Sequence, residues 1–99
     1  MTRMDKDQFQ RVAKALADPR RVEILEMIAS RGDVGCSKLC GSVPIAQATV
    51  SHHIKELVNA GLVQTRREGQ FVYCEARNDV LRAYIAELEG RLVREQSTQ

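Results

Sequence analysis

The sequence predicts one small, mainly α-helical domain with a β-hairpin near its C-terminal end. Apolar residues recur every three or four positions along most of the chain, which is typical of helices with one buried face. Residues 63–76 differ, because two short strand-like segments flank the turn-forming stretch RREGQ. A length of 99 residues suits a single domain, residues 1–99, with one modest core. We expect residues 1–5 and 95–99 to be frayed.

The first two helices follow from their apolar positions and their caps. One helix is expected from about Asp5 to Ala17. Its apolar positions are Phe9, Val12, Ala13 and Leu16. Asp18 and Pro19 form an N-cap and a first-turn proline, which start a second helix that runs to about Arg31 and ends at Gly32. The apolar face of this helix comprises Val22, Ile24, Leu25, Ile28 and Ala29.

Two further helices follow close together in the chain. A short helix over residues 37–43 is closed by Pro44, because proline disfavours helical backbone in the residue before it. A longer helix covers about residues 46–60 and ends at Gly61. The residues expected to face the core are Leu39 and Val43 in the short helix and Val50, Ile54, Leu57 and Val58 in the longer one.

The pattern then changes to strands and ends in one more helix. Strands over residues 63–66 and 71–76 form a hairpin with Gly69 in its turn. Asn78 and Asp79 are expected to cap the last helix. Its apolar stripe comprises Leu81, Tyr84, Ile85, Leu88 and Leu92. A short helix, a tight turn and a longer helix make a helix-turn-helix, and a hairpin after it makes a wing. The order of about five helices and a two-stranded wing therefore predicts a winged helix-turn-helix.

Three segments resemble the ArsR/SmtB family of transcriptional repressors. They are LADPRRVEIL at residues 16–25, QATVSHHIKELVNAGLV at residues 47–63 and REGQFVYCEA at residues 67–76. The resemblance covers about residues 8–90. It implies a homodimer that binds an operator in double-stranded DNA, represses transcription and, in many members, releases DNA on sensing an inducer.

The helix over residues 46–60 carries the polar face that we expect to read DNA. Since its apolar residues turn inward, the neighbouring polar residues lie on its outer face. The residues predicted to contact base edges or phosphates in the major groove are Gln47, Ala48, Thr49, Ser51, His52 and Lys55. His53 flanks the buried side and is expected to pack or to contact a phosphate. The alternative is an ordinary solvated helix face.

Cationic and polar residues near the hairpin turn form a second candidate contact surface. We predict that Arg67 and Gln70 contact the DNA backbone or the minor groove, with Arg66 a weaker candidate. The alternative is a charged hairpin that protects an edge strand. Arg20 and Arg21 either contact a phosphate or form ion pairs within their own helix.

Three cysteines suggest thiol chemistry. Cys36 and Cys40 stand four residues apart, so their thiols could hold arsenite, antimonite or another thiophilic ion, or be oxidised. Many members of the family that this chain resembles sense metals with a Cys-x-Cys pair here. In this chain Gly35 and Ser37 replace that pair, and only Cys40 matches a familiar position. Cys74 is expected to be a structural, buried cysteine. The last helix contains no histidine, which argues against a zinc or nickel sensor of the kind that the family places there.

The first and last helices carry more apolar surface than a monomer core needs. The residues predicted to form a two-fold interface are Phe9, Leu16, Leu81, Tyr84, Leu88 and Leu92. The alternative is that they only fill the monomer core. A dimer also suits two half-sites one DNA turn apart.

The bulk properties bound the function class. The formal charge is +2, and 11 of the 15 basic residues are arginines, so placement rather than net charge must indicate nucleic-acid binding. We see no catalytic nucleophile, base and acid set, and predict no enzyme activity. The lack of an apolar stretch of ~20 residues and the polar residues 1–6 predict a cytoplasmic protein with no membrane contact. Two alternatives stay open: a constitutive regulator without inducer, and a protein-interaction module, which the aromatic content of 4% disfavours.

Overall fold

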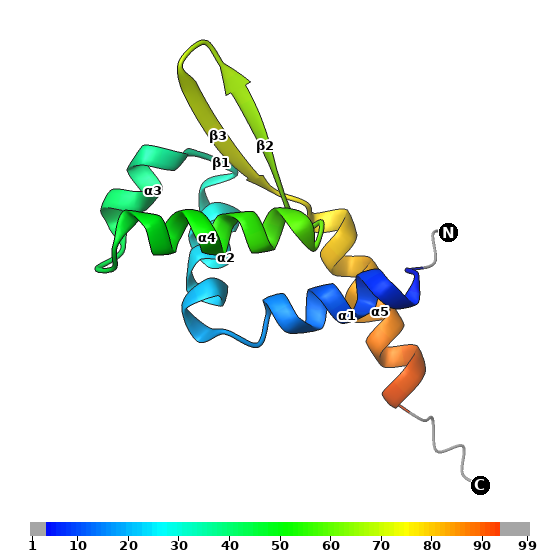
Figure 1. Cartoon of the computed structure of the whole chain (residues 1–99). Coiled ribbons are helices and arrows are strands. Elements are labelled where there is room, and N and C mark those ends of the chain that lie inside the picture. Colours follow the sequence, from blue (N-terminus) through cyan, green and yellow to red (C-terminus); the bar gives the residue numbers. More distant parts are fainter. Residues whose placement is uncertain (1–3, 94–99) are drawn as a thin grey trace, which may run out of the picture.

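The computed structural model describes residues 4–93 as five helices and one three-stranded sheet. In chain order the elements are α1 (Lys6–Ala15), α2 (Pro19–Arg31), β1 (Asp33–Gly35), α3 (Cys36–Ser42), α4 (Gln47–Asn59), β2 (Val63–Glu68), β3 (Phe71–Ala76) and α5 (Asn78–Leu92) (Figure 1). The predicted winged helix-turn-helix is confirmed. Met4 and Asp5, expected to be frayed, are instead part of the fold: Met4 is buried, and the Asp5 carboxylate accepts a hydrogen bond from the N–H of Gln8 at 2.8 Å. The rest of the ranges expected to be frayed, residues 1–3 and 95–99, lies outside the described residues.

The sheet contains one strand more than the predicted hairpin. β1 pairs antiparallel with β3 on the side away from β2, so the strand order is β1-β3-β2. Val34 of β1 lies opposite Cys74 of β3, and both side chains are buried. Three residues between two helices are too few to show an alternating pattern, which is why the sequence does not reveal β1. This pairing fixes the wing to the helical body along one edge.

The core lies where α2, α3, α4 and the base of the sheet meet. Its largest fully buried side chains are Ile24, Ile28, Leu39, Leu57 and Leu62. Two predicted inward positions are wrong, because Ala13 of α1 and Ala29 of α2 are exposed. The buried alanine of α1 is Ala15, three residues after the buried Val12 and so close to the same helix face.

The helix ends explain why the segments stop where they do. The Asp18 carboxylate accepts hydrogen bonds from the N–H groups of Arg20 (2.9 Å) and Arg21 (3.3 Å) and so caps α2 as predicted. Gly32 ends α2 with a φ of 81°, a conformation that costs glycine little. The predicted cap of α5 is wrong. Arg77 is the N-cap residue, and Asp79 lies in the first turn, where its carboxylate pairs with the Arg77 guanidinium at 2.9 Å.

The molecule is elongated, with extents of 58 × 27 × 23 Å. The hairpin of β2 and β3 projects beyond α4, and α5 extends away from the body at the other end (Figure 1). None of the helices in residues 4–93 has the length and apolar character needed to cross a membrane. The wing therefore projects at one end of the molecule and α5 at the other, with α4 crossing the body between them (Figure 1).

Candidate nucleic-acid interface

α4 separates a buried face from a face that is open to contact. Val50, Ile54 and Leu57 are buried against the core. The six predicted contact residues of α4 are all exposed: Gln47, Ala48, Thr49, Ser51, His52 and Lys55. Ala46 precedes the helix, and no side chain in residues 4–93 caps this N-terminus. An uncapped helix N-terminus leaves backbone N–H groups that suit a phosphate oxygen.

The two adjacent histidines have different surroundings. His53 is buried, and its Nδ1 accepts a hydrogen bond from Nε of Arg21 at 3.3 Å. Arg21 also donates to the backbone carbonyl oxygens of Lys14 and Ala15, each at 3.4 Å. His53 therefore packs, as the sequence indicates, and links α4 to α2, while His52 is exposed on the outer face.

The start of α2 holds a small charged cluster. The Arg20 guanidinium forms an ion pair with Glu23 at 2.9 Å, which is one of the two arrangements predicted for it. Burial alone would raise the pKa of Asp18, but hydrogen bonds from the N–H groups of Arg21 and Arg20 outweigh it. The pKa of Asp18 is therefore lowered, with further help from the charges of His53 and Arg21.

The wing carries one arginine in a network and one exposed arginine. The Arg66 guanidinium lies 2.9 Å from Asp33, 3.4 Å from Glu68 and 3.7 Å from Glu75, and it stacks on the Tyr73 ring at 4.9 Å. These partners hold Arg66 within the sheet. Arg67 is exposed and lies opposite Val72, in the part of the hairpin that projects beyond the helices (Figure 1).

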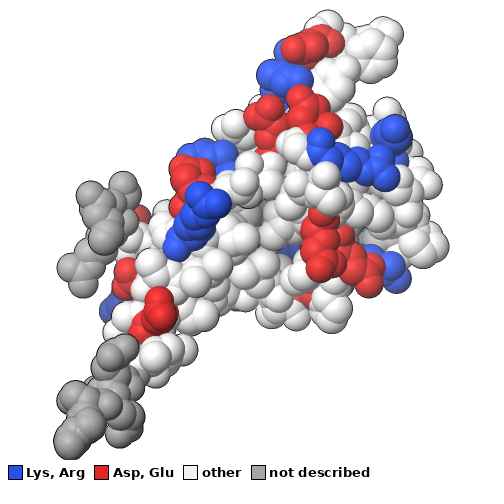
Figure 2. Space-filling model, turned by 180° about the vertical axis from the view of Figure 1, so that it is seen from behind, with Lys and Arg blue, Asp and Glu red and all other residues white. Residues whose placement is uncertain are grey.

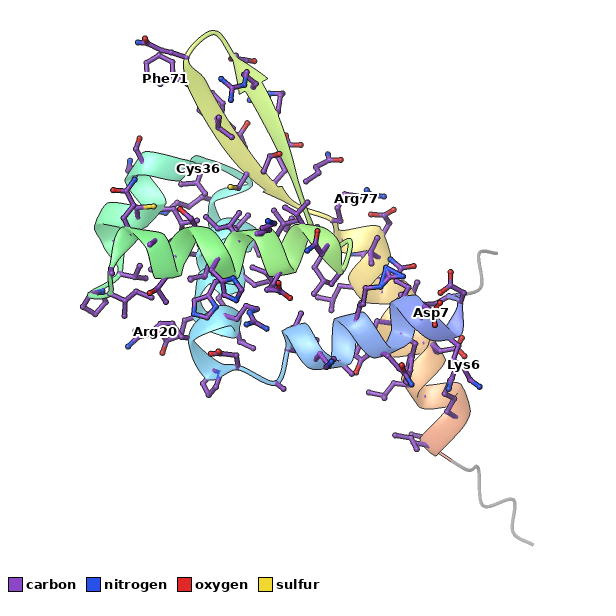
Figure 3. The ribbon with its side chains drawn as sticks, in the orientation of Figure 1. Lys6, Asp7, Arg20, Cys36, Phe71 and Arg77 are labelled. Atoms are coloured by element: carbon purple, nitrogen blue, oxygen red, sulfur yellow. The ribbon has the colours of Figure 1, made fainter. Side chains whose placement is uncertain are left out.

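The end of the wing carries the other predicted contact residue. Gln70 is exposed in the turn between β2 and β3. Phe71, labelled near the wing tip in Figure 3, is 56% exposed. The contacts of Arg67 and Gln70 with DNA stay a prediction.

A groove of about 460 Å³ lies between α3, α4 and the wing. Gln47 and Ser51 of α4 line it together with Gln70 from the turn of the wing. Ser37 and Lys38 of α3 also line it, although neither residue was predicted from the sequence. Their place in the first helix of the helix-turn-helix, the helix that crosses the DNA backbone in such proteins, is the signal that could have indicated them.

Two of the three cysteines line the same groove. Cys36 and Cys40 of α3 are both half-buried and face it. Cys36 Sγ, however, lies 3.2 Å from Sγ of Cys74, which is fully buried in β3. Figure 3 labels Cys36, where α3 begins beside the sheet. Cys74 is buried, as predicted, but its contact with Cys36 was not predicted from the sequence.

Both Cys40 and Cys74 are held in the thiol form. Burial raises the pKa of Cys74 to about 12, and the hydrogen bond with Cys36 and the proximity of the Cys36 and Cys40 sulfurs add to the rise. Burial and the charge of Cys36 raise the pKa of Cys40. Among residues 4–93 there is no cluster of three or more histidine, cysteine, aspartate or glutamate side chains placed to hold a metal ion.

The residues predicted to form a dimer interface lie on α1, directly after it, and on α5. Phe9, Leu16, Leu81, Tyr84 and Leu88 are partly buried, and the Phe9 and Tyr84 rings lie 5.2 Å apart. Leu92 is 73% exposed, and Ile85, two turns earlier on the same side of the helix, is 54% exposed. Every side chain described in α5 retains some solvent exposure, although the helix has fifteen residues and a regular apolar stripe.

On one face of the molecule, charged side chains of both signs lie close together. Seen from behind, basic and acidic side chains are interspersed over the body and the wing (Figure 2). This agrees with the formal charge of only +2. With so small a net charge, any contact with a polyanion depends on where individual cationic side chains lie.

Comparison with known proteins gives the same assignment as the fold. Residues 18–65 match the model of the "bacterial regulatory protein, arsR family". The chain is 33% identical over 79 residues to the arsenic resistance transcriptional regulator ArsR1 of Pseudomonas putida, a match that covers 80% of this chain and 62% of that protein. It is 33% identical over 70 residues to the transcriptional repressor SdpR of Bacillus subtilis, covering 71% and 77%.

A solved structure supports the relationship along the whole chain. The homodimeric winged helix-turn-helix DNA-binding domain of a Mycobacterium bovis regulator superposes with a TM-score of 0.71 and 28% identity, covering 100% of this chain and 98% of that one. With several curated relatives, including ArsR1, the matching segment spans less than two thirds of the relative's length. The fold, the arsR-family match and the likeness to SdpR lead to one conclusion: this chain belongs to the ArsR family of bacterial regulatory proteins.

Proposed function

We propose that this protein is a homodimeric, sequence-specific DNA-binding repressor, in which α4 reads the major groove and the wing tip contacts the backbone or the minor groove. The observation that carries the proposal is the groove between α3, α4 and the wing. Gln47 and Ser51 from α4 border the same hollow as Gln70 from the wing. Predicted contacts from two elements thus gather on one surface, which is what binding along a duplex requires.

The side chains on this surface have the chemistry that base and phosphate contacts need. Gln47 can donate a hydrogen bond to adenine and accept one from it through its amide. Ser51 can donate or accept through its hydroxyl, and His52 can do so through its imidazole. Lys55 and Arg67 supply cations for phosphates. All five side chains are exposed and none of them appears in an ion pair within residues 4–93.

Fluorescence anisotropy tests the proposal directly. The reduced protein is titrated onto a labelled duplex from the region upstream of its own reading frame, and onto a duplex of scrambled sequence. We expect tighter binding to the upstream duplex by about 10³-fold or more. Equal affinity for both duplexes, or none for either at low salt, contradicts the proposal.

A salt titration separates this function from the protein-interaction alternative. Neutralising phosphates releases counterions, so the logarithm of the affinity should fall linearly with the logarithm of salt concentration. Ser30→Ala, an exposed change on α2, serves as the matched control and should behave as the unaltered protein. If the surface instead binds another protein, the affinity for duplex DNA should be weak and should change little with salt concentration.

The dimer is proposed through α5 and α1. The exposed Ile85, Leu92 and Val93 lie around a mostly apolar hollow with Leu88. Burying such residues against a second copy would remove apolar surface from water, which is the main stabilising term in association. Two copies would also present two recognition helices to two half-sites.

An inducer that reacts with thiols is the finer part of the proposal. Cys36 and Cys40 line the groove that Gln47 and Ser51 also line, so a thiophilic ion bound there would lie beside the recognition helix. Relatives named as arsenical resistance regulators make arsenite the first compound to test. Anisotropy with and without arsenite decides this: release in the unaltered protein and no release in Cys36→Ser or Cys40→Ser supports it. Unaltered binding in arsenite contradicts this inducer and leaves the repressor proposal intact.

A further inference from the structure

The sulfur atoms of Cys36 and Cys74 are in contact at 3.2 Å, although 38 residues separate them in the chain. The contact follows from the pairing of β1 with β3. Gly35 lies opposite Tyr73 and Val34 lies opposite Cys74, so the residue directly after β1 reaches the middle of β3. Two sheet strands and the first turn of α3 thus hold the two thiols together, and no ion or ligand is needed to explain their approach.

We propose that Cys36 and Cys74 form a reversible intramolecular disulfide in response to a hydroperoxide, and that this bond weakens DNA binding. The disulfide would regulate the groove described above. Its effect on DNA binding rests on the proposed DNA-binding function, whereas formation of the bond does not. It assigns Cys74, expected to be only structural, as the partner of Cys36.

Geometry selects this pair over Cys36 and Cys40. A disulfide needs its Cβ atoms about 3.5–4.5 Å apart. Residues four apart on a helix have Cβ atoms roughly 5–6 Å apart, so the two cysteines of α3 would have to distort the helix. Cys36 and Cys74 already touch through their sulfurs, and a bond of about 2.05 Å asks for a closure of roughly 1 Å.

Exposure sets the order of the two steps. Cys36 is half-buried and lines the groove, whereas Cys74 has no exposed surface. The hydroperoxide therefore meets Cys36 first. The Cys36 sulfur attacks the outer peroxide oxygen, the O–O bond breaks, and the products are a sulfenic acid on Cys36 and an alcohol, or water from hydrogen peroxide.

The second step joins the two residues. Sγ of Cys74 attacks the sulfenic sulfur, the S–O bond breaks, and the departing hydroxide takes the Cys74 proton to form water. Two thiols are oxidised by two electrons, and one hydroperoxide is reduced. A thiol reductant reverses the reaction by exchange.

The bond would act on the two elements that we propose to contact DNA. Cys36 begins α3, which is packed against α4, and Cys74 belongs to the strand that forms the wing. Gln47 and Ser51 face the segment from Gln70 to Tyr73 across the groove at this point. A bond that draws the start of α3 toward β3 would therefore change the distance between the recognition helix and the wing tip. Both elements must fit the same duplex.

Peptide mapping tests the disulfide independently of DNA. Cleavage after lysine and arginine places the three cysteines on three different peptides, residues 32–38, 39–55 and 68–77. After treatment with hydrogen peroxide and alkylation of remaining thiols, we expect residues 32–38 to be joined to residues 68–77, in protein that runs as a monomer on a non-reducing denaturing gel. A link between residues 32–38 and 39–55, a link between two chains, or no link overturns the proposal.

Anisotropy on the operator duplex tests the effect on DNA. We expect peroxide to weaken binding by about tenfold, within the usual range of coupling between two sites, and dithiothreitol to restore it. Cys40→Ser should respond as the unaltered protein, whereas Cys36→Ser should bind and not respond. A mapped disulfide with unchanged affinity overturns the regulatory half. Failure of the reduced protein to bind any duplex instead contradicts the proposed function, while the mapping result stands apart from it.

Discussion

Nε of Arg21 donates a hydrogen bond to Nδ1 of His53 at 3.3 Å, and this bond joins the start of α2 to the middle of the recognition helix. His52, the preceding residue, is exposed. Two adjacent histidines of α4 therefore have opposite roles, one in the stability of the helix-turn-helix and one on its contact surface.

We predict that His53→Ala lowers the free energy of unfolding by about 1–3 kcal/mol, because it leaves the Arg21 N–H group without its acceptor in a partly buried place. His52→Ala is the matched control and should change stability by about 0.5 kcal/mol or less. Urea unfolding measures both. Equal stabilities of the two variants would contradict the role assigned to His53. His52→Ala should instead weaken binding to the operator.

Gln47→Ala should weaken binding to the operator and relax the preference for one base. A glutamine amide that pairs with adenine discriminates against other bases by about 1–3 kcal/mol. The measurement is anisotropy on a set of duplexes that differ at single positions. A uniform loss on all duplexes would show that Gln47 contacts the backbone and does not read a base.

The two neighbouring arginines of β2 are predicted to separate binding from stability. Arg67→Gln should reduce the slope of affinity against salt by about 1 and leave unfolding unchanged. Arg66→Gln should cost about 0–1 kcal/mol of stability, since its ion pairs with Asp33 and Glu75 are partly exposed. Salt-dependent anisotropy and urea unfolding on both variants provide the comparison. The prediction fails if the two variants exchange these effects.

Ile85→Asp is expected to dissociate the dimer, because it places a charge in apolar surface that the second copy would cover. Sedimentation velocity at a fixed concentration measures the change from dimer to monomer. Ala86→Ser, an exposed change one residue further along α5, is the control and should remain dimeric. A monomeric unaltered protein, or an Ile85→Asp variant that stays dimeric, excludes this interface.

Asp18 makes part of the stability depend on pH. Its pKa in the folded protein lies below the ordinary value of 3.8, so the unfolded chain binds this proton more tightly. The contribution is therefore present above that ordinary value and is lost as the pH falls through the lowered one. Asp18→Asn can still accept the N–H bonds of the cap but cannot titrate. Thermal unfolding between neutral pH and about pH 2 should show a smaller loss of stability in Asp18→Asn than in the unaltered protein.

Much of the fold follows from local pattern. The spacing of apolar residues and the residues Asp18, Gly32 and Gly69 predict the helices, their order and the hairpin, because these signals act over a few neighbouring positions. The outward position of the α4 contact residues follows from the same periodicity. The cap of α5 was predicted wrongly, because the helix begins at Asn78 and the Asp79 carboxylate, in the first turn, pairs with Arg77 instead of capping the helix.

What the sequence could not reveal depends on long-range register. The contact of Cys36 with Cys74 requires β1 to exist and to pair with β3 in one particular alignment, and neither has a local signal. The bond between Arg21 and His53 similarly depends on how α2 crosses α4. Such contacts are decided by packing of the whole core, which no single segment encodes.

Only Arg77 lies between the end of β3 and the start of α5, and its N–H donates to the carbonyl oxygen of Leu62 at 2.7 Å. The wing therefore passes into the proposed dimer helix with almost no slack. In a dimer built through α5, the distance and angle between the two wings would be set by this junction and not by a flexible linker. Such a protein should tolerate little change in operator spacer length, since adding about half a helical turn of DNA, roughly five base pairs, rotates one half-site to the far side of the duplex.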